Sequence, residues 1–358
     1  MTTGAATARG GEAVRRTQVA IMGAGSIGCH LGGWLASNAE VTLIGRAPII
    51  DAIEAQGLTV SDLDGHRRTV APTSLTLATE ASAVVDADYV LMTTKSNGTA
   101  RATRQIAPYL DPDSVVVSFQ NGLRAASIID EALGSAFPSR ASRPLALSGM
   151  VPFNVVRTGD THWAQTVSGR MKVKDHPRID PFIRAAHGAG LQIGVEPDMR
   201  AVLFGKLLLN LNNAVNALTG QPLAIQLRDR DCRTVLAACQ DEALVLARRL
   251  GVSPARMTPL PPALVPSLLR SPNPVFTTLS RASLKVSPQA RSSMADDLSA
   301  GRSTEIDEMQ GAIVALGRTH GTSTPVSSRI VDLVREAEEA GADRRRWTGA
   351  QLRDAVGL

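Results

Sequence analysis

The sequence predicts an α/β fold, in which an N-terminal Rossmann-type dinucleotide-binding domain is followed by a mostly α-helical C-terminal domain. A β-branched run, QVAIM at Gln18–Met22, leads directly into a glycine-rich turn, GAGSIG at Gly23–Gly28. Short apolar runs typical of buried strands recur after it, and from Pro197 onward the apolar residues follow the helical period instead. We therefore expect a disordered tail over residues 1–16, a cofactor-binding Rossmann domain over 17–196, a helical substrate and catalytic domain over 197–345, and a C-terminal tail over 346–358.

The composition excludes several classes of partner. The 358 residues are 44% apolar and 20% charged, enough for the cores of two domains. The net charge is +5 without a basic run, and only 3% of residues are aromatic, so no nucleic-acid partner is expected. No apolar run approaches the roughly 20 residues that span a membrane. Three cysteines without metal-ligand spacing predict no metal site and a reducing cytoplasm.

The glycine-rich turn is the first candidate site, because a strand precedes it and a helix over Cys29–Ser37 is expected to follow. In such a turn the first glycine permits the tight bend, the second lets the backbone approach a pyrophosphate, and the third lets the helix pack on the strand. The helix N-terminus adds unpaired N–H groups for the phosphates. The candidate cofactor-binding residues here are Gly23, Ala24, Gly25, Ser26, Ile27 and Gly28.

The second strand, Glu40–Ile44, suggests which dinucleotide binds. An NAD site usually carries an acid after this strand, but here Gly45-Arg46 follows. An arginine at this point suits the 2′-phosphate of NADP(H), whereas the alternative is an ordinary surface arginine. Lys95 follows the strand Asp88–Thr93 and could reach the same phosphate or be a surface lysine.

Asn121 follows the next strand, Ser114–Phe119, within the segment Gln120–Leu123. An asparagine in a turn usually serves the turn itself. At the carboxyl end of a strand beside a cofactor, it could instead orient the nicotinamide or the substrate.

The connecting segments carry weaker signals. Asp64-Gly65 and Thr158–Thr161 predict hairpin turns. Asp231–Leu250 predicts a strong amphipathic helix, and the proline-rich stretch Ser253–Pro274 predicts an irregular crossing loop. His162 and His176 are isolated and are interpreted as structural.

The stretch Met199–Gly220 predicts a helix of several turns that ends at Gly220. Lys206, Asn210 and Asn213 lie at positions i, i+4 and i+7 and therefore share one face of it. This face is either a solvated stripe or a site for a small polar, anionic molecule. Buried amides and a buried lysine would need polar partners.

Together these motifs resemble the ketopantoate reductase (2-dehydropantoate 2-reductase) family. The matching pieces follow the order of the family and cover the chain from Gln18 to about Glu339. The specific ones are a Lys-Leu-x-x-Asn helix followed by Ser-Ser-Met and Thr-Glu-Ile-Asp. The pieces are GAGSIG at Gly23–Gly28, TKS at Thr94–Ser96, QNGL at Gln120–Leu123, GKLLLN at Gly205–Asn210, SSM at Ser292–Met294 and TEID at Thr304–Asp307.

The resemblance implies a substrate cleft between the two domains and a role for each matching residue. Lys206 looks like the catalytic lysine, and Glu305 like the acid that faces both the cofactor and the catalytic centre. Arg46 and Lys95 look like the pair that favours NADPH. Asn121 looks like the residue that touches cofactor and substrate, with Asn210, Ser293 and, by its place on the helix, Asn213 as substrate ligands.

The chain departs from the family in two places. Where the family has a second substrate asparagine this chain has Ala214, with Asn213 and Asn216 on either side. The proline-rich stretch is longer than in compact members and could reshape the substrate pocket. A continuous helix would also point Ser293 and Glu305 about 120° apart, so they converge only if the helix breaks, and Gly301 is the expected break.

From these residues we expect NADPH-dependent reduction of a 2-oxo acid, namely ketopantoate to pantoate in pantothenate biosynthesis. Two alternatives stay open: a reductase of the same architecture for another branched or aromatic 2-oxo acid, and a non-catalytic NADP(H)-sensing protein. The small 2-oxo acid is the expected partner, and a homodimer is the candidate assembly. Ser293 could also cap its helix, and Glu305 could lie on a solvated face.

Overall fold

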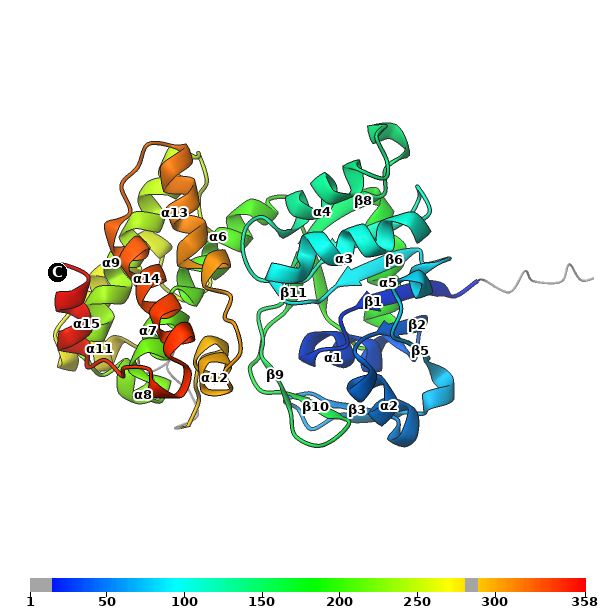
Figure 1. Cartoon of the computed structure of the whole chain (residues 1–358), viewed down its shortest axis with the longest axis horizontal. Coiled ribbons are helices and arrows are strands. Elements are labelled where there is room, and N and C mark those ends of the chain that lie inside the picture. Colours follow the sequence, from blue (N-terminus) through cyan, green and yellow to red (C-terminus); the bar gives the residue numbers. More distant parts are fainter. Residues whose placement is uncertain (1–14, 281–288) are drawn as a thin grey trace, which may run out of the picture.

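The computed structural model describes residues 15–280 and 289–358. The predicted disordered tail falls almost entirely on residues 1–14, outside the described residues. Figure 1 shows a sheet-containing domain beside a helical one, with the sequence passing from the first to the second. No described helix is both long and apolar enough to cross a membrane.

The main sheet of the first domain has eight strands in the order β12-β11-β8-β7-β6-β1-β2-β5. All neighbouring strands pair in parallel except β11 with β8. The predicted Rossmann-type sheet is therefore confirmed, with a mixed edge. Its strands are β1 (Thr17–Met22), β2 (Ala39–Ile44), β5 (Thr76–Ala78), β6 (Tyr89–Met92), β7 (Val115–Ser118), β8 (Leu145–Met150), β11 (Met171–Lys174) and β12 (Ile193–Glu196).

Helices cover both faces of this sheet, because successive strand residues point to opposite sides. Ile21 packs in a core that includes α1 (Ser26–Leu35), α2 (Ala47–Gln56) and α5 (Asp180–Gly188), whereas its neighbour Ala20 packs with α3 (Thr99–Ile106) and α4 (Ala125–Gly134). Burial on both faces explains why these strands read as continuous apolar runs.

The strand register brings the predicted cofactor residues to one edge. Met22 pairs with both Ile44 and Met92, and Met92 also pairs with Ser118. These are the last residues of β1, β2, β6 and β7. The glycine turn, Arg46, Lys95 and Asn121 therefore all follow strands that end at the same edge of the sheet.

Both predicted hairpins are confirmed in a second sheet, with the order β4-β3-β10-β9. The antiparallel pair β3 (Leu58–Ser61) and β4 (Arg67–Val70) is joined through Gly65, which has φ +88°. The antiparallel pair β9 (Val155–Arg157) and β10 (His162–Gln165) forms the other hairpin. This sheet packs against α1.

The second domain is helical around one core. The long helix α9 packs against α6, α7, α10, α13, α14 and α15, and its buried Cys232 and Cys239 are core residues as expected. The helices are α6 (Met199–Asn210), α7 (Asn212–Thr219), α8 (Leu223–Gln226), α9 (Arg230–Arg249), α10 (Val265–Arg270), α11 (Asn273–Ser280), α12 (Ser293–Ser299), α13 (Gln310–Thr319), α14 (Pro325–Ala340) and α15 (Gly349–Ala355).

The predicted Met199–Gly220 helix is two helices, α6 and α7, with Leu211 at the junction. Two buried side-chain amides bind carbonyls beside it. Gln310 donates to the Leu211 carbonyl at 2.7 Å, and Gln240 donates to the Leu208 carbonyl at 2.9 Å. Side chains that bind helix carbonyls interrupt the ladder and explain the break. Gly220 ends α7 in the left-handed region, φ +66°, as predicted.

Two further expectations were wrong. Of the proline-rich stretch, residues 253–261 are irregular, but a 3₁₀ turn (Pro262–Leu264), α10 and the first residues of α11 occupy the rest. Proline stands in the first turn of each, where its missing N–H costs nothing. Residues 346–358 are no tail, since α15 packs on α9 with Leu352 fully buried.

Candidate active site

The glycine turn has the shape that a dinucleotide needs. The Gly23 and Ala24 N–H groups donate to the Ile44 carbonyl at 3.0 and 2.9 Å, and Gly23 has φ +120°. A Cβ on Gly28 would lie 2.1 Å from the Gly23 carbonyl oxygen, whereas a Cβ on Gly25 would meet nothing within 4 Å. The turn is therefore closed on the strand side and open above Gly25, where α1 begins without a side-chain cap. A pyrophosphate fits this open side.

Arg46 lies beside the turn. A Cβ on Gly45 would lie 2.5 Å from that of Ala24, so the residue before Arg46 contacts the turn directly. Arg46 is exposed at the N-terminal boundary of α2. A contact of Arg46 with a cofactor phosphate stays a prediction.

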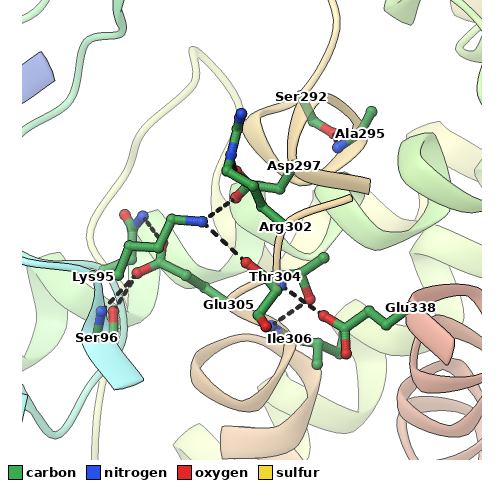
Figure 2. Close-up of polar contacts among 12 residues, drawn as sticks. Lys95, Ser96, Ser292, Ala295, Asp297, Arg302, Thr304, Glu305, Ile306 and Glu338 are labelled. Atoms are coloured by element: carbon green, nitrogen blue, oxygen red, sulfur yellow. Dashed lines mark hydrogen bonds and ion pairs between the residues drawn. The ribbon is translucent and has the colours of Figure 1, made fainter. Parts of the chain in front are cut away.

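Lys95 makes a contact that the sequence did not suggest. The two residues before it pack on the glycine turn, since a Cβ on Gly23 would lie 2.7 Å from the Thr94 nitrogen. The Lys95 ammonium crosses to the helical domain and donates to Asp297 Oδ2 at 2.9 Å and to the Ser303 carbonyl at 3.0 Å (Figure 2). Lys95 is therefore partly exposed, and its ammonium is held by two oxygens of the helical domain.

Glu305 is not on a solvated face. Its Oε1 accepts from the Ser96 N–H at 3.0 Å and from Ser96 Oγ at 2.5 Å, as Figure 2 shows. Its Oε2 accepts from Asn121 Nδ2 at 2.9 Å. The expected break occurs, because α12 ends at Ser299 and Gly301 has φ +62°. The chain after the break carries Glu305 to the carboxyl edge of the sheet.

Lys206 points from α6 toward the sheet domain. Its ammonium donates to the carbonyl of Val151, just after β8, at 2.7 Å. Burial lowers the pKa of Lys206 from the ordinary 10.5 to about 8, and the charge of Glu305 opposes that shift. A partly buried amine whose pKa lies near neutrality can donate a proton under ordinary conditions.

The two asparagines predicted as substrate ligands on this stretch, Asn210 and Asn213, have different partners. Asn210 Nδ2 approaches Asn121 Oδ1 at 3.5 Å and so adjoins Glu305 through Asn121. Asn213 donates instead to Met309 Sδ at 3.8 Å. Asn216 is fully buried and donates to the Gln221 carbonyl, which makes it structural. Ala214, at the position of the family's second asparagine, is buried in the core.

Ser293 is exposed as the first residue of α12. It does not cap the helix. Ser292 does so, because its Oγ accepts from the Ala295 N–H at 3.2 Å. The exposed Ser293 hydroxyl is therefore available to a ligand.

A second carboxyl, Glu308, lies against the Asn121 loop. Gly122 has φ +95°, and a Cβ there would lie 2.5 Å from Glu308 Oε2. Burial, with the nearby charge of Glu305, raises the pKa of Glu308. The glycine is required both for the turn and for this close approach.

Sequence reasoning gave no role to Ser96, Asp297, Glu308 or the Val151 carbonyl. Ser96 was visible only as part of the TKS motif. Backbone groups carry no residue signature, so nothing in the sequence could have identified the Val151 carbonyl. The partner of Lys95 lies about two hundred residues away in the chain and depends on how the domains meet.

Family models match both halves of this arrangement. The ketopantoate reductase PanE/ApbA model matches residues 19–178, and its C-terminal counterpart matches residues 198–338. The chain belongs to the ketopantoate reductase family. The resemblance inferred from the motifs is thereby confirmed.

Individual relatives are similar to this chain over nearly its whole length. A 2-dehydropantoate 2-reductase of Halobacterium salinarum is 28% identical over 90% of this chain and 100% of that protein. A PanE/ApbA family ketopantoate reductase from Ralstonia eutropha JMP134 has a TM-score of 0.77 at 28% identity, over 91% and 99% of the two chains. The chain is therefore an oxidoreductase that acts on CH–OH groups.

A more distant structure shares the fold. D-mandelate dehydrogenase, solved with NADH and anilino(oxo)acetate, has a TM-score of 0.72 at 20% identity, over 90% and 99% of the two chains. At this identity the likeness shows the architecture alone.

Proposed function

We propose that the protein reduces a 2-oxo acid with NADPH, and that this acid is ketopantoate, which yields pantoate. The observation that carries the proposal is a lysine ammonium from the helical domain placed at the carboxyl edge of a dinucleotide-binding sheet. Lys206 reaches the carbonyl that follows β8, while Glu305 binds Ser96 and Asn121 on the same edge.

Reduction of a ketone needs a hydride at its carbon and a proton at its oxygen. The nicotinamide supplies the hydride when bound. Residues Gly23–Gly28 would hold its pyrophosphate. The Lys206 ammonium would donate a hydrogen bond to the ketone oxygen in place of the Val151 carbonyl, stabilise the developing alkoxide and deliver the proton.

Glu305 has two roles in this proposal. Its negative charge favours the protonated form of Lys206. Its contact with Asn121 Nδ2 also fixes the amide of Asn121, so that Oδ1 faces Asn210. Asn210, Ser293 and Asn121 would bind the carboxylate and a hydroxyl without adding charge, which leaves the proton-donor role to Lys206.

The preference for NADPH rests on Arg46, which stands where an NAD site carries an acid. Arg46→Ala should weaken NADPH binding about tenfold or more while NADH binding changes little, because only NADPH has the 2′-phosphate. Fluorescence titration with both cofactors measures this. An unchanged ratio of the two dissociation constants would remove the argument for NADPH.

A panel of 2-oxo acids, followed by NADPH oxidation, tests the substrate. Ketopantoate should give the highest kcat/KM. A higher value for another branched or aromatic 2-oxo acid would favour the alternative reductase. Cofactor binding without turnover of any acid would favour a sensor, although a sensor has no need of Lys206 and Glu305 at one edge. Cytoplasmic location and a homodimer stay predictions.

A further inference from the structure

Asp297 holds two cations that come from different domains. Its Oδ2 accepts from Lys95 at 2.9 Å, and its Oδ1 accepts from Arg302 Nε at 2.8 Å (Figure 2). The side chain of Asp297 is only 13% exposed, whereas those of Lys95 and Arg302 are 44% and 56% exposed. Among the described residues, Lys95 and Asp297 form the one ion pair that joins the sheet domain to the helical domain.

The same Lys95 belongs to the cofactor side of the cleft. It directly follows Thr93 and Thr94, which pack on Gly23 of the glycine turn. The family resemblance implies that its ammonium and Arg46 bind the 2′-phosphate, and we adopt that role here. Two of the three N–H donors of this ammonium are already occupied, by Asp297 and by the Ser303 carbonyl.

A phosphate monoester that bound Lys95 would have to share this cation with the Asp297 carboxylate. The phosphate carries a charge of about −1.5 to −2 near neutral pH, so placing it beside an aspartate also costs repulsion. With Asp297 present, the cluster of Lys95, Arg302 and Asp297 has a net charge of +1. Without that carboxylate the charge is +2.

We propose that Asp297 is a cofactor-specificity residue, which limits the preference for NADPH over NADH by competing with the 2′-phosphate for Lys95. NADH has no group at this position and does not meet the competition. This inference rests on the proposed function for its choice of cofactor, and on the family resemblance for the role of Lys95 at the 2′-phosphate. It assigns to Asp297 a role in cofactor specificity, beyond a purely structural contact between the domains.

The test is Asp297→Asn, with Asp296→Asn as the matched control. Asp296 lies on the same helix, is 59% exposed, and reaches only Arg291 at 3.9 Å. Both variants remove one negative charge from α12. The dissociation constants of NADPH and NADH are measured by fluorescence titration without substrate, and thermal unfolding checks that each variant is folded.

Asp297→Asn should tighten NADPH binding about fivefold and change NADH binding less than about twofold, the size expected for one partly exposed ion pair. Asp296→Asn should leave the ratio unchanged. In a Lys95→Met background, Asp297→Asn should alter the ratio much less, because the shared cation is gone and only the direct repulsion between the carboxylate and the phosphate remains. A shift that persists there at full size, or that also appears in Asp296→Asn, would overturn the proposal.

Arg302→Gln gives an opposite test on an exposed residue, where misfolding is of little concern. With its second cation removed, Asp297 should hold Lys95 more tightly, and the cluster also loses one positive charge. Both effects should weaken NADPH binding while NADH binding does not change. Equal changes in the dissociation constants of NADPH and NADH, in this variant or in Asp297→Asn, would show that the role of Asp297 is purely structural. If the unaltered protein bound neither cofactor, the proposed function itself would fail, which is a distinguishable result.

Discussion

Lys206 is the residue on which the proposed chemistry depends, and its neighbours explain its state. It lies partly buried on α6, its ammonium donates to one carbonyl, and the negative charge of Glu305 acts on it. Burial favours the neutral amine and the carboxylate favours the ammonium. The balance leaves a cation that gives up its proton more readily than a surface lysine.

Lys206→Ala should lower kcat by about a hundredfold to ten-thousandfold, the usual contribution of a positioned general acid. NADPH affinity should change little, because the glycine turn and Arg46 lie elsewhere on the sheet edge. Steady-state kinetics and cofactor titration separate the two effects. Lys172→Ala, which removes a lysine paired with Glu196, is the control and should keep its activity. Equal loss of cofactor affinity in Lys206→Ala would contradict the assigned role.

The pH dependence of reduction should follow the same amine. The pKa of Lys206 is lowered from 10.5 to about 8, so the ammonium is the main form below pH 8 and is lost as the pH rises through it. We expect kcat/KM for reduction to fall about tenfold per pH unit above this point. A profile that stays flat up to about pH 10, with cofactor affinity constant, would show that no such proton is needed.

At this scale the sequence predicted side chains better than their partners. Lys206 and Glu305 belong to specific motifs, and both lie at the domain junction as the resemblance implied. Their catalytic roles stay a prediction. The partner of Lys206 is a backbone carbonyl, and that of Lys95 is an aspartate on α12. Neither has a local sequence signal, since both depend on the way in which two domains meet.

At the level of elements, the proline-rich segment packs against α6 and contacts its backbone. The Ala255 N–H donates to the Ala201 carbonyl of α6 at 2.9 Å. A Cβ on Gly205 would lie 2.3 Å from the Ala255 carbonyl oxygen, so only glycine permits this contact. Because Gly205 precedes Lys206, the proline-rich segment supports the helix that carries the lysine. Its effect on the shape of the substrate pocket stays a prediction.

Gly205→Ala should therefore destabilise the fold by about 1–3 kcal/mol, the usual cost of overpacking a close contact. It should also lower kcat, because α6 and residues 253–261 must move apart. Urea unfolding and kinetics measure the two effects. Gly159→Ala is the matched control, since the nearest atom to its Cβ would be 3.7 Å away. If the two variants had the same unfolding free energy, the segment at Ala255 would be able to move away from the added methyl group without a loss of stability.

Element types were predictable wherever the apolar period was long, as for α9 and the strands at the sheet edge. The wrong element predictions came from residues that occur in more than one kind of local structure. Proline in residues 262–274 begins helical turns rather than ending them. The break at Leu211 depends on Gln240 and Gln310, which are distant in sequence, so a continuous helix was the natural prediction.

In the whole molecule, most residues that form hydrogen bonds across the domain junction belong to the predicted site or lie next to it in the chain. The hydrogen bonds between residues 15–197 and the rest of the described chain come from Lys95, Ser96, Asn121 and Lys206, with Glu305, Asn210 and Asp297 among their partners. A change in how the domains meet must therefore change the site. The resemblance predicts these residues as one site, whereas the contacts themselves could not be foreseen, because they depend on how the domains meet.

Glu305→Gln tests this coupling. The variant keeps the size of the side chain but places an N–H₂ group against either Ser96 or Asn121, both of which are donors. We expect kcat to fall at least about tenfold. We also expect the rise in Tm on addition of NADPH to shrink, since a ligand stabilises a protein only through its affinity for the folded state. Glu339→Gln, on the exposed side of α14, should match the unaltered protein in both respects.

If Glu305→Gln lost activity but kept the full NADPH-induced rise in Tm, Glu305 would act on the reaction alone. The domain contact and the cofactor site would then be separable.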